Sequence, residues 1–340
     1  MNKIDREASL AKLFTPRENY KPFEYPEYGK IWEDQSNAFW LHTKIPMASD
    51  VTDFHIKLTD VEKTIVEKIL MGFSQTECEV GSNWNETIAQ YFAPHEIKHA
   101  AYCFSYFETI HAQAYFFLNE TLGLDKNVMA FLEDKTTRAK LDNLKDRSPL
   151  RKDGTVDYMA LALNLSIFAG VGEGVCLYSS FAILLSFMPR NLLKGVSQQM
   201  TWSVRDESLH SNTGSHLFKQ MVKEVPSLIE TKELENKIRE AFDLGLKLEI
   251  DFILSVFEIG ALPNLSADQL INFMKYRCND RFSALGFSGL LYDIDEDLLE
   301  QMTWFEMCTG SSQKKDFFVV KPSEYSKSTE DWSTAGLSLD

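Results

Sequence analysis

The stretch FAGVGEGVCLYSSFAILL, residues 168–185, places one charged side chain, Glu173, in an otherwise apolar segment, and no Lys, Arg or His lies within eight residues of it. A carboxylate in an apolar helix loses its hydration, which costs several kcal/mol unless something compensates. Gly170, Gly172 and Gly174 each weaken a helix further, by roughly 0.8–1.0 kcal/mol relative to alanine. A segment that carries both penalties predicts a functional role for Glu173.

The composition bounds the class of protein. With 340 residues, 44% of them hydrophobic, the chain can bury a large core without disulfides. Its five cysteines include no C-x-x-C pair, which fits a reducing compartment, so we expect a cytoplasmic protein. The formal net charge of −15 argues against a nucleic-acid groove, because such a groove needs clustered Lys and Arg.

Residues 159–188 are the one candidate membrane span, because they are long and apolar enough to cross a bilayer. Within them, Glu173 and Asn164 are costly in lipid, roughly 2.5–3.5 kcal/mol for a charge at the centre of a helix. The N-terminal twenty residues lack the apolar core of a signal peptide. We therefore expect a helix buried in a bundle, and no membrane partner.

Hydrophobic residues recur at the helical period along most of the chain, and strand-like alternation is scarce. Thr59 and Glu62 form a capping-box pattern ahead of a helix to about Phe92, and Pro94 suits the first turn of a helix to about Leu122. Further helices are expected over 156–187, 191–223, 229–259 and 266–287. The predicted fold class is all-α with long helices, followed after about residue 310 by a polar, mobile tail.

The pattern E-x-x-H puts a carboxylate and an imidazole one turn apart on the same helix face. It occurs three times, as Glu96/His99, Glu108/His111 and Glu207/His210. Glu96 falls in the first turn of its helix, where an acidic residue favours the helix dipole, and about 120° around the helix from Glu108. We expect the first pair to lie on the solvated surface.

The other two pairs are predicted to point inward. Glu108 and His111 lie within YCFSYFETIHAQAYFFL, where aromatic residues surround them, and Glu207 and His210 continue an apolar stripe along their helix. Two inward pairs on separate helices, with an inward Glu from each of two further helices, form the ligand set of a carboxylate-bridged dinuclear metal site in a four-helix bundle. Glu173 supplies one of the two lone carboxylates.

The second lone carboxylate has to come from residues 59–92, which contain Glu77, Glu79 and Glu86. Glu77 continues the four-residue steps of Ile65, Ile69 and Phe73, whereas Glu79 is about 200° away and is expected to face solvent. The predicted ligands are Glu77, Glu108, His111, Glu173, Glu207 and His210. A site rich in oxygen ligands, with two imidazoles and no thiolate, favours iron or manganese and redox chemistry with oxygen species. A core of metal-free Glu–His pairs is the alternative.

Tyr115 follows His111 by four residues and Glu108 by seven, so it lies on the same helix face, one turn beyond the ligands. At this point the sequence resembles the small, radical-generating subunit of class I ribonucleotide reductases, over roughly residues 20–310. The matching elements are Glu77, ETIH at 108–111 with Tyr115, Glu173 in its apolar helix, and RDESLH at 205–210. Their order and separations match that family.

The resemblance implies a ferritin-like helical bundle with additional long helices, here over residues 1–311, of which 1–20 form a candidate flexible arm. It also implies a flexible tail, 312–340, that docks on a large subunit. In that family two metal ions react with an oxygen species and generate an oxidant, stored as a tyrosyl radical at the position of Tyr115. The oxidant is passed to the large subunit, which reduces ribonucleotides to deoxyribonucleotides.

A radical-transfer route also follows from the resemblance, with Trp40, Asp206 and His111 at the positions of its hydrogen-bonded residues. Asp206 suits a role in orienting an imidazole whose other nitrogen holds metal. In the tail, Tyr325 is the candidate relay to the large subunit, ahead of Trp332, and the final residues WSTAGLSLD would dock there. The family also implies a homodimer, and a flavoprotein activator is a further candidate partner.

One position departs from the commonest family pattern. Many members with a tyrosyl radical have Asp where this chain has Glu77, and the branch with Glu uses manganese and iron and replaces the tyrosine by phenylalanine. This chain has both Glu77 and Tyr115, so Fe/Fe, Mn/Fe and Mn/Mn centres stay open, as does storage of the oxidant on the metals. A radical on Tyr115 would be shielded by an apolar pocket of Phe104, Phe116 or Phe181.

Three other classes compete with this interpretation. A ferritin-like oxidase or monooxygenase would use the same ligands but would not explain a Trp40–Asp206 partnership. A metal store would bind many ions per chain, and a purely structural helical protein would bind none. Phosphate-binding and dinucleotide-binding glycine motifs and paired thiols are absent from the sequence, so we expect substrate reduction on a separate subunit.

Overall fold

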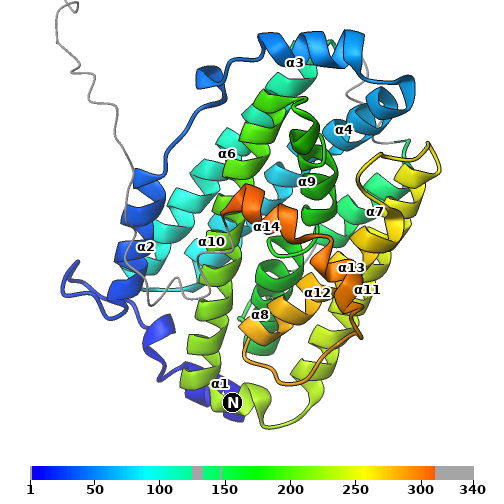
Figure 1. Ribbon diagram of the computed structural model, residues 1–340. Helices are drawn as coiled ribbons and strands as arrows, with labels where there is room; N and C mark the ends of the chain where they lie inside the picture. Colours follow the sequence, from blue (N-terminus) through cyan, green and yellow to red (C-terminus); the bar gives the residue numbers. More distant parts are fainter. Residues whose placement is uncertain (1, 125–132, 146–147, 311–340) are drawn as a thin grey trace, which may run out of the picture.

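The structure is a computed structural model that describes residues 2–124, 133–145 and 148–310 (Figure 1). The α-helices are α1 Lys3–Ala8, α2 Pro26–Asn37, α3 Ala48–Thr52, α4 Asp60–Asn83, α5 Ala89–Tyr91, α6 His95–Leu122, α7 Lys135–Leu144, α8 Tyr158–Ile167, α9 Tyr178–Leu185, α10 Lys194–Glu224, α11 Glu233–Phe257, α12 Ala267–Ala284, α13 Glu296–Glu300 and α14 Thr303–Thr309. Short 3-10 or π turns are η1 Lys12–Phe14, η2 His42–Lys44, η3 Asp53–Lys57, η4 Trp84–Ile88, η7 Phe168–Gly172, η8 Met188–Arg190 and η9 Pro226–Ile229. No strand occurs in the described residues, and the predicted tail lies outside them.

The helix boundaries follow the predicted signals closely. Thr59 and Glu62 form a reciprocal capping box at the start of α4. Helix α6 begins just after Pro94 and ends at Leu122, and the φ of 75° at the following Gly123 is the left-handed conformation that glycine adopts without strain. The helices predicted over 191–223, 229–259 and 266–287 correspond to α10, α11 and α12 with ends that differ by a few residues.

The helix predicted over 156–187 is not continuous, which corrects the sequence-based expectation. It divides into α8, the π turn η7, an irregular turn over 173–177, and α9. The amide of Glu173 bonds the carbonyl of Phe168 at 2.9 Å, five residues back, as in a π turn. A Cβ on Gly170 would lie 2.8 Å from the Phe242 ring, so this glycine allows α11 to pack closely against the distorted segment.

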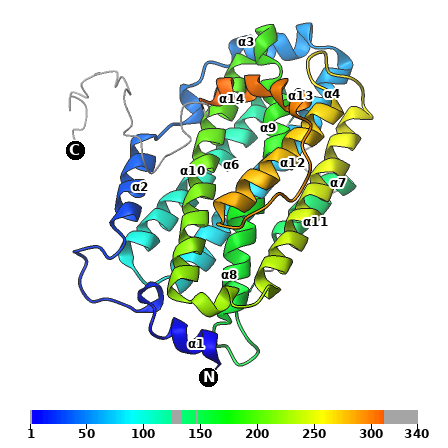
Figure 2. The ribbon, with the colours of Figure 1, turned by 60° about the horizontal axis from the view of Figure 1, so that its bottom comes forward.

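Helices α4, α6 and α10 and the α8–α9 segment run alongside one another and form the centre of the bundle (Figure 2). Helix α2 packs on the outer side of α6, while α11 and α12 pack against each other and against η7. Most of residues 159–188 are buried in this arrangement, including all of 164–187. Within the described ranges, no helix is both long and apolar enough to cross a membrane.

Candidate metal centre

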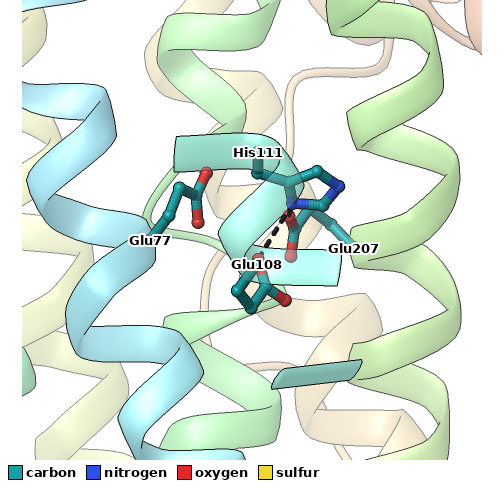
Figure 3. A group of neighbouring side chains, drawn as sticks. All are labelled: Glu77, Glu108, His111 and Glu207. Atoms are coloured by element: carbon teal, nitrogen blue, oxygen red, sulfur yellow. Dashed lines mark hydrogen bonds and ion pairs between the residues drawn. The ribbon is translucent and has the colours of Figure 1, made fainter. Parts of the chain in front are cut away.

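The structure brings the six predicted ligand side chains together in the middle of the bundle. Glu77 comes from α4, Glu108 and His111 from α6, Glu173 from the turn after η7, and Glu207 and His210 from α10. Each of the six is at most 2% exposed. Figure 3 shows how Glu77, Glu108, His111 and Glu207 face one another from their helices.

The ligand atoms form two groups within the described part of the chain. The first group is Glu77, Glu108, His111 and Glu207, and the second is Glu108, Glu173, Glu207 and His210. In each group, one ligand atom per residue lies within 4.8 Å of the others. Glu108 and Glu207 belong to both groups, so each would be available to metal ions held at either of two neighbouring positions.

Several buried carboxylate oxygens of the cluster have no hydrogen-bond partner, and such atoms indicate whether a metal ion would fit there. Both carboxylate oxygens of Glu77 are buried without a hydrogen-bond partner, and so is Oε2 of Glu173. A buried carboxylate that lacks a partner is strongly destabilising, because its hydration has been removed without replacement. Four carboxylates around two positions offset the charge of two divalent cations. The residues therefore fit a dinuclear metal site.

The electrostatics of the cluster are those of crowded, buried acids and bases. Burial raises the pKa of Glu77 and of Glu207 well above the ordinary range, and the charge of Glu108 raises both further. Burial lowers the pKa of His210, but the Glu108 and Glu173 carboxylates together outweigh this effect and raise it to about 9. Without cations the site therefore holds extra protons, which bound metal ions would have to displace.

Asp206 connects the cluster to Trp40. The indole Nε1 of Trp40 donates to Asp206 Oδ2 at 2.7 Å, and the same oxygen lies 3.2 Å from Nε2 of His111. The ring of Trp40 stacks on the His111 ring, with centroids 5.7 Å apart. Nδ1 of His111 lies 2.9 Å from Glu108 and 3.0 Å from Glu207. One imidazole nitrogen therefore faces the ligand cluster, and the other faces Asp206. Such an outer partner orients an imidazole for metal binding.

Tyr115 is fully buried beside the cluster, with its ring centroid 6.2 Å from that of His111. Its closest aromatic contact is Phe73, with ring centroids 4.8 Å apart. Phe73 was not among the residues predicted to surround Tyr115. Phe181 packs on Phe73, at 5.6 Å. The expectation for Phe116 is wrong: this side chain is 38% exposed, because it lies on the outer face of α6. Burial raises the pKa of the Tyr115 phenol well above its usual value, so the hydroxyl stays protonated.

Glu96 corrects another expectation. It was predicted on the solvated surface, but it is fully buried and apart from both ligand groups. Its carboxylate pairs with Arg17 at 2.7 Å and accepts the backbone amides of Glu24 at 2.8 Å and Tyr25 at 2.9 Å. The segment before α2 covers the first turn of α6, and helical periodicity within α6 contains no information about that contact.

The prediction for Glu77, Glu79 and Glu86 agrees with the structure in one respect and differs in another. Of Glu77, Glu79 and Glu86, Glu77 is the one that joins the ligand groups. Glu86 is exposed, whereas Glu79, which was expected to face solvent, is half-buried. Sequence reasoning also missed the role of Trp84, whose Nε1 donates to Glu173 Oε1 at 2.5 Å. Trp84 follows Glu77 by seven residues and so lies on the same inward helix face, which was the sequence signal for this contact.

Comparison with known proteins identifies the family. The sequence-family model of the ribonucleotide reductase small chain matches residues 17–296. The chain belongs to this family. Its activity is accordingly that of a ribonucleoside-diphosphate reductase small subunit, and the predicted family, enzyme class and all-α, ferritin-like fold are confirmed.

Relatives match over most of the chain. The probable ribonucleoside-diphosphate reductase small subunit of Invertebrate iridescent virus 3 is 31% identical, with 94% of this chain and 88% of the relative covered. The ribonucleoside-diphosphate reductase subunit beta of Chlamydia pneumoniae is 25% identical, with 88% of each covered. Among solved structures, the ribonucleotide reductase R2 subunit of Clostridium botulinum has a TM-score of 0.71 at 21% identity and covers 84% of this chain and 89% of its own.

The dimanganese(II)-NrdF structure of Streptococcus sanguinis has the same type of fold, with a TM-score of 0.70 at 20% identity, and covers 85% of this chain and 99% of its own. At this level of identity the two structures establish a shared fold. The ligand groups of the present chain, the family match and the shared fold together support a dinuclear metal site in the bundle.

Proposed function

We propose that Glu77, Glu108, His111, Glu173, Glu207 and His210 hold two metal ions, and that the centre supplies the radical oxidant for ribonucleoside-diphosphate reduction on a large subunit. The observation that carries this proposal is the pair of buried ligand groups that share Glu108 and Glu207. Bound iron or manganese would supply one-electron redox chemistry with an oxygen species.

The metal pair is proposed from the donor set. Carboxylate oxygens outnumber imidazoles in both groups, and no thiolate is among the donors, which favours iron or manganese over zinc or copper(I). The Streptococcus sanguinis relative is described as a dimanganese(II) protein, which supports manganese as one candidate for this fold. Electron paramagnetic resonance on protein loaded with iron, manganese or both separates the three pairings.

The residues around the ligands have proposed roles of their own. Tyr115 is the candidate site of the stored radical, because its buried ring is shielded from solvent reductants beside the ligands. Trp40 and Asp206 are the candidate outward relay, since Asp206 Oδ2 lies within 3.2 Å of both the Trp40 indole nitrogen and the His111 imidazole. The tail candidates Tyr325 and Trp332 lie outside the described residues.

Family membership implies a large-subunit partner and, in general, a homodimer. Docking through residues 312–340 stays a prediction, because these residues lie outside the described ranges. It is tested by deleting residues 321–340, which should abolish ribonucleotide reduction while metal content stays intact. A flavoprotein activator and a cytoplasmic location also stay predictions.

The outer face of α2 and α6 is the surface that we expect a second copy to cover. An open groove of about 430 Å³ lies there, and its rim includes Trp32, Phe39, Tyr102 and Tyr106, which are 45%, 48%, 50% and 53% exposed. None of the groove residues is acidic. In a chain of net charge −15, such a face minimises repulsion between two copies. Sedimentation of Tyr106→Glu should show a shift towards monomer.

Metal analysis of two Glu variants tests the proposed centre. Glu207 belongs to both ligand groups, so Glu207→Ala should lose both ions. Glu96 is equally buried but belongs to neither group, so Glu96→Ala should keep its metal while losing stability, about 3–5 kcal/mol for breaking a buried ion pair. Equal metal content in the two variants would refute the ligand assignment.

A further inference from the structure

Glu173 belongs to one of the two ligand groups and lies on an irregular turn, so its position needs support from outside its own helix. In a regular helix the amide of Tyr178 would bond the carbonyl of Gly174, but here it bonds Val175 O at 3.0 Å. The carbonyl that follows Glu173 in the chain is therefore released from the helical pattern. Its donor comes instead from α12.

Arg277 on α12 supplies that donor. Its Nη2 donates to Gly174 O at 2.8 Å and its Nε to the same oxygen at 3.2 Å. The guanidinium carbon lies 3.6 Å from the ring centroid of Tyr178, so the planar group is held against the first residue of α9. The Tyr178 hydroxyl contacts Ser208 Oγ at 3.0 Å, next to Glu207. A planar fork with two donors and an aromatic stacking partner has little freedom to move.

Arg281, one helical turn further along α12, holds the same region from a second side. Its Nη1 lies 3.2 Å from Ser211 Oγ, and Ser211 follows the ligand His210 and donates to Ala169 O in η7 at 2.6 Å. A Cβ on Gly174 would lie 2.5 Å from Arg281 Cδ, so only glycine lets this side chain cross the turn. Helix α12 thus contacts the residues next to Glu173 and His210. These two ligands belong to the second ligand group and not to the first.

We propose that Arg277 is a positioning residue for Glu173 and thereby controls the metal affinity of the Glu173/His210 position, with little effect on the Glu77/His111 position. This inference rests on the proposed dinuclear centre. Residues beyond the ligands typically change metal affinity by about 10- to 100-fold when they are substituted. Because the direct hydrogen bonds of Arg277 are to the residue after Glu173, a ligand of the second group only, the effect should be larger for one of the two ions.

The test is an anaerobic Mn²⁺ titration of the full chain, followed by electron paramagnetic resonance and metal analysis. Wild type should bind two ions. Arg277→Met should bind the first with wild-type affinity and the second about 10- to 100-fold more weakly. At intermediate Mn²⁺ concentration the variant should therefore show the signal of isolated Mn²⁺. Arg277→Lys can still donate one hydrogen bond to Gly174 O and should fall between the two.

Arg239→Met is the matched control. Arg239 also stacks on an aromatic ring, Phe282, at 4.4 Å, but its guanidinium pairs with Glu235, which is in neither ligand group. This variant should bind both ions as wild type does, and thermal unfolding checks that all variants are folded. The proposal is overturned if Arg277→Met keeps both affinities, weakens both equally, or behaves like Arg239→Met. Fewer than two ions in wild type would overturn the dinuclear centre itself.

Discussion

The indole nitrogen of Trp84 donates a 2.5 Å hydrogen bond to Oε1 of Glu173, across 89 residues of sequence. Trp84 lies in η4, directly after the helix that carries Glu77, and is 1% exposed. The bond occupies one carboxylate oxygen of Glu173 and leaves Oε2 without a hydrogen bond. Glu173 is thus held by a neutral donor on one side, with its other oxygen directed to the ligand group.

Replacing Trp84 by Phe keeps an aromatic ring but removes the donor. In metal-free protein the buried Glu173 carboxylate loses its hydrogen bond, which should lower the free energy of unfolding by about 1–3 kcal/mol. With metal bound the loss should be smaller, because a cation then compensates the carboxylate. Urea unfolding of metal-free and metal-loaded Trp84→Phe, each compared with wild type, measures both losses. The comparison cancels the packing cost of the smaller ring, and equal losses would contradict the prediction.

The Trp40–Asp206 hydrogen bond makes a prediction about turnover. Trp40→Phe removes the N–H that reaches Asp206, so ribonucleotide reduction with the large subunit should be largely lost while metal content is retained. Trp202→Phe is the control, because its ring lies 5.3 Å from that of Trp40 and is not part of the proposed relay. If both variants turn over equally well, Trp40 is not in the route.

Tyr115→Phe separates the two candidate stores of the oxidant. We expect this variant to lose both the organic radical signal and ribonucleotide reduction, because Tyr115 is the buried phenol whose ring lies 6.2 Å from that of His111. Tyr102→Phe, on the same helix but 50% exposed, should retain both. Near-normal turnover by Tyr115→Phe would instead assign the oxidant to the metal pair.

Glu62 makes a prediction about acid stability. Burial pushes its pKa upward, but hydrogen bonds from Arg190 and Thr59 outweigh this effect and hold it below the ordinary value of 4.5. A carboxyl with a lowered pKa contributes stability above its unfolded-state pKa, and this contribution is lost as pH falls through the folded-state value. Glu62→Gln can still cap Thr59 but has no charge for Arg190. It should be about 1.5–3 kcal/mol less stable than wild type at pH 7.

Unfolding measured from pH 7 to pH 3 tests this prediction. The stability difference between wild type and Glu62→Gln should begin to shrink near pH 4.5, where the carboxyl of the unfolded chain takes up a proton, and should be lost below the lowered pKa of the folded state. Glu233→Gln is a control, because Glu233 lies in the first turn of α11 and pairs with Lys237 on the surface. A Glu62→Gln difference that stays constant over this range would show that the charge of Glu62 does not contribute.

Much of the cluster follows from local helix geometry. A step of three or four residues returns to the same helix face. The three-residue spacing of Glu108 with His111, and of Glu207 with His210, therefore places each pair on one face without any tertiary contact. The same step along residues 59–92 selected Glu77 over Glu79 and Glu86. The all-α fold and the capping box at Thr59 are likewise consequences of short-range spacing and propensity.

The tertiary structure decided what lies between helices. Trp84 as the partner of Glu173, Phe73 beside Tyr115, the burial of Glu96 under the segment before α2, and the hold of Arg277 on Gly174 all join residues distant in sequence. The break after α8 also depends on tertiary contacts, because the irregular turn there packs against Phe242 of α11 and accepts a hydrogen bond from Arg277 of α12. Periodicity specifies which face of a helix is apolar, but only packing determines which residue meets that face.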